Sequence, residues 1–126
     1  MKERRSILGH MTARVREGAS PSAVAIVYLD GRMTFGDGDE LFKKIIDQLL
    51  ARGSLRVVVD MGNLSYMDSS GVDAVVRSYN KLAERNGKLR LVVTTDRIKN
   101  LFEITKLLTV IEIFGTEEEA LADFKA

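Results

Sequence analysis

Hydrophobic residues recur along the chain with two periods, the two-residue repeat of strands and the helical repeat of three to four residues. Residues 12–17 alternate, with Ala13 and Val15 on one face, and residues 23–29 are almost wholly apolar. The turn-forming residues 18–22 between these two segments include the single proline of the chain. This arrangement predicts a hairpin whose first strand lies at a sheet edge and whose second strand is buried.

Two further strands are separated by an amphipathic helix. Residues 55–60 carry a Val-Val-Val run that indicates an interior strand of a parallel region, and residues 89–93 predict another strand. Between them, apolar residues at helical spacing predict a helix over residues 70–85 that packs on the sheet. Its expected sheet-facing side chains are those of Val72, Val75, Val76, Tyr79 and Leu82.

Another helix is predicted ahead of residue 55. Its apolar stripe begins at Leu41, and Gly53 is a natural stop after the last turn. Two residues are candidates for its N-terminal cap. Asp37 precedes Glu40 by three residues and fits a capping box, whereas Asp39 fits a simple cap.

The C-terminal part adds a third helix over Ile98–Thr105, a short strand over Val110–Phe114 and a last helix capped by Thr116. The element order is therefore ββαβαβαβα. Strands that alternate with helices predict an α/β domain with a mixed, mostly parallel sheet and about four helices. We expect one domain over residues 1–126, in which residues 1–10 form a loose terminus.

Composition supports a folded domain and narrows its chemistry. The 126 residues fit one domain, and 45% of them are hydrophobic. Lys and Arg number 19 against 18 Asp and Glu, so the net charge is +1 and lacks the basic excess of a general nucleic-acid binder. The chain has no cysteine and one histidine, His10, which argues against thiol, multi-histidine metal and histidine-based chemistry. No stretch of the roughly 20 apolar residues that span a bilayer is present. We therefore expect a cytoplasmic protein without a membrane partner.

The most informative segment precedes the helix at residues 70–85 and contains small polar residues in excess. Ser and Asp satisfy the unpaired N–H groups of a helix start, so one interpretation is a simple cap. In that interpretation Asp68 or Ser69 is the cap and Ser70 pairs with Asp73. A cap needs only one such residue, and a glycine in the first turn, Gly71, costs about 1 kcal/mol relative to alanine. The segment also fits an open, electropositive helix start that tolerates a phosphate on a serine hydroxyl.

The segment Leu64–Val72, LSYMDSSGV, resembles the signature of the STAS family, the anti-sigma factor antagonists of bacteria. Gly31, the VVVD strand, the turn and strand at residues 87–93 and the tail at residues 117–121 fall where that family has similar features. The resemblance covers about Thr12–Phe124.

This resemblance implies a partner-switching regulator of transcription that is not an enzyme and needs no cofactor or metal. Such a protein, when unmodified, binds an anti-sigma factor that is also a serine kinase, and so releases a sigma factor. Phosphorylation of the first serine after the aspartate, here Ser69, breaks the complex, and a phosphatase restores it. The implied partner surface comprises Asp68, Ser69, Ser70, Gly71, Arg32, Met33 and Thr34.

The segment after Gly31 and the motif itself also depart from the family pattern. Thr34 stands where many members have an acid, and Asp73 stands where a small residue is common. A STAS scaffold or signalling module that no kinase switches is therefore an alternative function. Met33 and Phe35, in an otherwise polar loop, either fill the core or contact a partner.

Other constellations suggest alternatives from different classes. Asp60, at the end of a predicted strand, matches the position of the phosphoacceptor aspartate in receiver domains. Asp37, Asp39 and Glu40 are hard oxygen ligands that suit Mg²⁺ or Ca²⁺, with helix capping as the competing interpretation. A Ser-His-Asp hydrolase would require His10 to fold back onto the motif serine.

Overall fold

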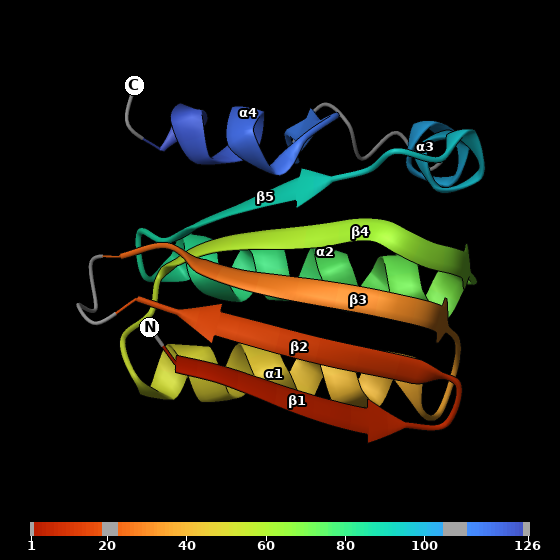
Figure 1. The fold of residues 1–126 in the computed structure, drawn as a ribbon, viewed down its shortest axis with the longest axis horizontal. Helices are drawn as coiled ribbons and strands as arrows, with labels where there is room; N and C mark the ends of the chain where they lie inside the picture. The colour runs from red at the N-terminus through yellow and green to blue at the C-terminus, as the bar shows by residue number, and fades with distance from the viewer. Residues whose placement is uncertain (1, 19–22, 105–110, 125–126) are drawn as a thin grey trace.

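A computed structural model describes residues 2–18, 23–104 and 111–124 of the chain. These residues form one six-stranded sheet whose strands lie side by side in chain order (Figure 1). The strands are β1 (Lys2–Leu8), β2 (Met11–Glu17), β3 (Ala25–Met33), β4 (Arg56–Met67), β5 (Lys88–Val92) and β6 (Ile113–Phe114). The helices are α1 (Gly38–Ala51), α2 (Ser69–Glu84), α3 (Asp96–Ile104) and α4 (Glu117–Asp123).

The sheet has an antiparallel part and a parallel part. β1, β2 and β3 pair antiparallel, and β3, β4, β5 and β6 pair parallel. Parallel neighbours need crossover connections, and right-handed crossovers in one direction place all their helices on one face. The side chains of α1, α2 and α3 accordingly share one core with that face of the sheet. α4 packs against a second, smaller cluster that includes Ile26, Val58 and Val92.

The predicted α/β class and the order ββαβαβαβα are confirmed from β2 onward, but the loose terminus predicted for residues 1–10 is wrong. Residues 2–8 form β1, which pairs with β2 along its whole length. Apolar and polar side chains do not alternate along this strand, because ion pairs rather than apolar burial hold it beside β2. Arg4 contacts Glu17 at 2.8 Å, and Glu17 also contacts Arg52 at 2.6 Å.

β4 is longer than its apolar run. The predicted strand ends at residue 60, whereas residues 61–67 continue it to Met67. Met61, Leu64 and Met67 are buried at intervals of three residues, which is not the alternation of a regular strand. Register shifts between β3 and β4 explain this spacing and displace the side chains from strict alternation.

The predicted packing of α2 on the sheet is confirmed. Val72, Val75 and Leu82 are buried, and Val76 and Tyr79 pack partly buried against the same core. The other predicted details of the C-terminal helix and strand that fall on residues 105–110, Thr105 and Val110 among them, lie outside the described residues. The same holds for residues 19–22 of the first turn.

The start of α1 differs from the predicted capping box. Asp37 occupies the cap position but its side chain makes no capping hydrogen bond. Asp39 is buried, and its Oδ1 accepts hydrogen bonds from the N–H groups of Gly36 and Glu40, both at 2.8 Å. Neither predicted cap is therefore correct, because Asp37 has no capping bond and Asp39 lies inside the helix, where it holds the loop before it.

Candidate partner-binding and phosphorylation site

Asp68 joins two loops at the carboxyl ends of β3 and β4. It is the N-cap of α2, and its Oδ1 accepts a hydrogen bond from the N–H of Gly71 at 3.1 Å. Its Oδ2 accepts a hydrogen bond from the N–H of Phe35, in the β3–α1 loop, at 3.0 Å. Its own N–H donates to the carbonyl of Met33 at 3.3 Å. One carboxylate thus fixes the start of α2 and the neighbouring loop together.

Ser69 is the first residue of α2 and is exposed. The first helical turn leaves backbone N–H groups without helical partners and carries a partial positive charge. No acidic side chain lies within the first turn of α2. α2 is 16 residues long, and no side chain of its first turn neutralises the partial positive charge of the helix start. A phosphate on Ser69 would therefore meet this positive charge.

Gly71 is buried, so its role differs from the open approach expected from the sequence. A Cβ at this position would lie 2.5 Å from Cγ of Met67 and 3.0 Å from the carbonyl oxygen of Met33. Only glycine allows α2 to begin this close to the ends of β3 and β4. Gly71 shapes the site from beneath and offers no surface to a partner.

Met33 is also misplaced in the predicted partner surface. Its side chain is fully buried in the main core, because it points to the helix-covered face of the sheet. Of the two predicted roles for Met33, filling the core is correct. A glutamate in place of Met33 would therefore bury a carboxylate in this core. Phe35, two residues later, is 79% exposed.

Arg32 and Tyr66 lie opposite each other on adjacent strands and extend the exposed region. The Arg32 guanidinium lies 5.1 Å from the centre of the Tyr66 ring, and both residues are exposed. Next to them, the hydroxyl of Ser65 donates to the carbonyl of Gly31 at 2.9 Å. We call Arg32, Phe35, Tyr66 and Ser69 the Ser69 surface.

Apart from the buried Met33 and Gly71, the predicted site residues divide into two groups. Asp68, Ser70 and Thr34 are partly buried, while Ser69 and Arg32 are exposed. Sequence reasoning omitted Tyr66 from the site and offered Phe35 as either a core residue or a partner contact; its exposure excludes the core role. Asp73 takes no part as a cap partner in the predicted box; it forms an ion pair with Arg77 at 2.7 Å.

The carboxylates proposed for other chemistries are each engaged separately. Asp60 lies inside β4 rather than at its end, and its Oδ1 accepts a hydrogen bond from the N–H of Gly62 at 2.8 Å. Glu40 contacts Lys43 at 3.5 Å, away from the loop bonds of Asp39. Among the described residues, no three histidine, cysteine or acidic side chains converge on a possible metal position.

The position of His10 does not support the alternative of a Ser-His-Asp hydrolase. His10 is exposed in the β1–β2 turn, where its carbonyl accepts a hydrogen bond from the N–H of Arg32 at 2.9 Å. Gly31, at a φ of +99°, permits this close approach, because a Cβ there would overlap that carbonyl. In the described part of the chain, no helix is long and apolar enough to cross a membrane.

The fold and site define an α/β domain that presents a serine at a helix start beside an exposed aromatic loop. The STAS domain family model matches residues 10–120, and the chain belongs to that family. It is similar to the anti-sigma-B factor antagonist of Listeria monocytogenes, with 34% identity over 77 residues, which cover 61% of this chain and 68% of the relative.

Solved structures show the same fold. An anti-sigma factor antagonist from Mycobacterium paratuberculosis aligns with a TM-score of 0.82 and 17% identity, covering 92% of this chain and 95% of the other. The anti-sigma factor antagonist SpoIIAA in its unphosphorylated form aligns with a TM-score of 0.70 and 21% identity, covering 90% and 98%. Both of these solved structures, like the Listeria relative, are anti-sigma factor antagonists, and a sulfate transporter family protein from Wolinella succinogenes shares the fold with a TM-score of 0.67.

Proposed function

We propose that this chain is an anti-sigma factor antagonist that binds an anti-sigma factor through the Ser69 surface and loses that partner when Ser69 is phosphorylated. The names of its relatives supply the class of partner. The observation that carries the proposal is the position of Ser69, exposed at the start of α2 and adjacent to the Asp68 carboxylate that holds the Phe35 loop.

In the unmodified state this surface offers little net charge. Phe35 and Tyr66 provide apolar contact area, Ser69 provides a neutral hydroxyl, and Arg32 is a single cation stacked near the Tyr66 ring. Aromatic and arginine side chains are enriched at protein interfaces. A partner surface that fits this arrangement must lie close to the Ser69 hydroxyl.

A phosphate at Ser69 would change binding more than folding. It adds a charge of about −1.5 to −2, which the N–H groups and dipole of the helix start can accommodate. Asp68 keeps its hydrogen bonds to Gly71 and Phe35, so the loop anchor does not depend on the hydroxyl. The partner would have to bury the new charge beside Asp68. A loss of about 3 kcal/mol would weaken the affinity roughly a hundredfold.

The chain is the substrate of this chemistry and does not catalyse it. The anti-sigma factor acts as the serine kinase and transfers the terminal phosphoryl group of ATP to Oγ of Ser69, with release of ADP and a proton. A phosphatase hydrolyses the phosphoserine and restores the binding form. Because these partners act on transcription, we place the protein in the cytoplasm.

The proposal is tested with the serine kinase that co-purifies with the protein from its native cells. Wild type, Ser69→Ala and Ser70→Ala are incubated with this kinase and ATP, and the modified residue is mapped by mass spectrometry. Ser70→Ala is the matched control, because Ser70 is the neighbouring hydroxyl in the same helical turn. We expect phosphate on Ser69 in wild type and in Ser70→Ala, and none in Ser69→Ala.

Calorimetry then measures the affinity of each form for the same partner. We expect wild type and Ser69→Ala to bind about equally, Ser69→Asp to bind more weakly, and the phosphorylated protein to bind about a hundredfold more weakly. Modification confined to Ser70, Ser65 or Thr34 would contradict the assignment. Equal affinity of the unmodified and phosphorylated forms would support a scaffold that no kinase switches.

A further inference from the structure

β1 leaves one side of the sheet open. β2 is its sole neighbour in the strand order of the described residues, and all seven of its residues pair with β2 without a register shift. Proteins commonly protect such an edge with charged side chains, a bulge, a proline or a covering segment. Residues 2–5 of β1 are charged, but its last part has no charge, bulge or proline, and there Ile7 is 70% and Leu8 is 41% exposed.

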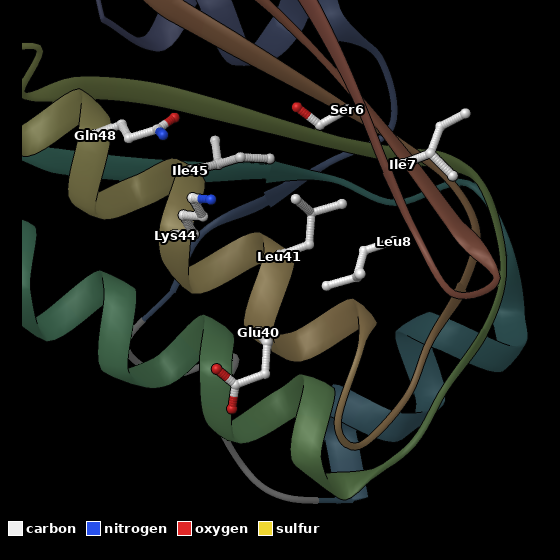
Figure 2. A pocket seen from close by; sticks show the side chains of 8 residues that line it. All are labelled: Ser6, Ile7, Leu8, Glu40, Leu41, Lys44, Ile45 and Gln48. Carbon is white, nitrogen blue, oxygen red and sulfur yellow. The ribbon is translucent and has the colours of Figure 1, made fainter.

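A groove lies beside this edge, between β1 and α1. Its volume is about 360 Å³, and its lining includes Ser6, Leu8, Leu41 and Ile45, with Lys44 at its side. Figure 2 shows Leu8 and Leu41 turned toward the space between strand and helix, whereas Ile7 points away from α1. The groove therefore places apolar side chains directly next to an unpaired strand edge.

The turn that precedes β2 determines which backbone groups of β1 face outward. β1 and β2 are joined by the two residues Gly9 and His10, and Gly9 has a φ of +61°, as in a two-residue hairpin turn with glycine in first place. The pair that closes such a turn, Leu8 and Met11, exchanges its hydrogen bonds across the hairpin. Because bonded and non-bonded pairs alternate, the N–H and C=O groups of residues 3, 5 and 7 point away from β2.

The two faces of β1 differ in chemistry. Ser6 and Leu8 lie opposite Ala13 and Met11, on the face that α1 covers, so an added strand would meet apolar surface beside these two residues. Arg4 lies on the same face and is held by Glu17. On the other face Arg5 lies directly opposite Arg14. Arg14 contacts Glu3 at 3.4 Å, whereas Arg5 forms no ion pair within the described residues, so the repulsion between the two arginines is only partly offset. An acidic side chain beside Arg5 would offset that repulsion.

We propose that the β1 edge binds an extended segment of a partner protein by strand addition, and that this segment alternates apolar residues toward α1 with acidic residues toward Arg5. Main-chain hydrogen bonds supply affinity in this mode and alternate side chains supply specificity. Charge favours such a segment over a second copy of the chain. β1 carries three basic residues and one acidic residue, so pairing with itself would bring basic strands together.

The experiment uses the full chain labelled with ¹⁵N and a synthetic peptide, acetyl-Asp-Val-Glu-Leu-Asp-Val-Glu-Leu-amide. We expect the largest NMR shift changes at the amides of Glu3, Arg5 and Ile7, whose N–H groups face outward. Arg5→Glu should weaken binding at least about tenfold. Arg97→Glu is the matched control, because it makes the same charge change at an exposed position on α3 and should change affinity less than about twofold.

Ser69→Asp should bind the peptide like wild type, which separates this proposal from the function proposed for Ser69. The proposal is overturned if shift changes avoid β1, if Arg5→Glu and Arg97→Glu bind alike, or if wild type shows no binding at about 1 mM peptide. Dimerisation of the free protein, with NMR shift changes at the same three amides, would also overturn the proposal. A second copy of the chain would then be the occupant of the edge.

Discussion

The Ser69 surface and the β1 edge are both exposed, but the structure holds them in place by different means. Beneath the Ser69 surface lie the buried side chains of Met33 and Met67 and the tightly packed Gly71. β1 instead relies on its pairing with β2 and on the ion pair between Arg4 and Glu17. This ion pair is partly buried, and ion pairs near the surface contribute about 1 kcal/mol or less, whereas truncation of a buried side chain costs several kcal/mol. A change beneath the first region should unfold the domain, and a change along the second should act locally.

The largest effect is expected from a charge placed under the Ser69 surface. Met33→Glu puts a carboxylate into a fully buried position without a partner and should lower the free energy of unfolding by at least about 3 kcal/mol. Urea denaturation measures this loss. An unchanged midpoint would show that the end of β3 is not anchored in the core.

Phe35→Glu is the matched control for that variant, two residues along the same loop. Because Phe35 is 79% exposed, this change should alter stability by less than about 0.5 kcal/mol. It should nevertheless weaken binding of the anti-sigma factor, measured by calorimetry, because it adds a charge to the Ser69 surface. Equal affinity of wild type and Phe35→Glu would move the partner surface away from this loop.

A smaller loss is expected when only one methyl group is added beneath the site. Gly71→Ala would bring its Cβ to 2.5 Å from Cγ of Met67, and such overpacking costs about 1–3 kcal/mol. Gly115→Ala is the control, because a Cβ there meets no atom within 4 Å. Thermal melting of both variants tests the contrast. Similar melting temperatures would mean that the start of α2 can move away from β3.

The β1 edge should respond to the loss of its ion pair without unfolding of the domain. Glu17→Gln weakens the contacts with Arg4 and Arg52 and should lower global stability by less than about 1 kcal/mol. Hydrogen exchange should rise at the β1 amides that face β2 and stay unchanged in β4. Equal increases in both strands would show that the two regions unfold together.

The smallest expected effect concerns Tyr28, on the face of β3 that α4 packs against. Burial, and then the hydrogen bond to Glu117 at 2.6 Å, raise the pKa of Tyr28 above its usual value of 10.0. The unfolded chain therefore loses this proton first, so stability is fully present below about pH 10 and falls as the pH rises through the higher folded-state pKa. Urea denaturation at about pH 9 and about pH 11 should show a smaller fall for Tyr28→Phe than for wild type. An equal fall would assign the pH dependence to other groups.

The two regions also differ in how far the sequence predicts them. The helices and strands around α2 bury regular stripes of side chains, so their periods reveal both the elements and their packing. The charged side chains of β1 show no such period, because an edge strand held by ion pairs buries no apolar face.

Within the site, the motif identified Asp68 and Ser69, whereas side-chain direction could not be predicted next to them. Register shifts between β3 and β4 decide that Met33 points into the core, and a shift of one residue reverses the face of every side chain. The contact between Asp68 and Phe35 joins residues 33 positions apart, so no local pattern could reveal it.

The agreement between strand order and chain order has a consequence for how the domain is made. Each of β2 to β6 pairs with the strand synthesised just before it, and none has to enter between two strands that are already paired. Domains fold as the chain leaves the ribosome, and contacts between neighbouring segments form with little loss of chain entropy. The sheet can therefore grow one strand at a time from a single side. Among the described strands β1 is made before the other five, and its outer edge pairs with none of them.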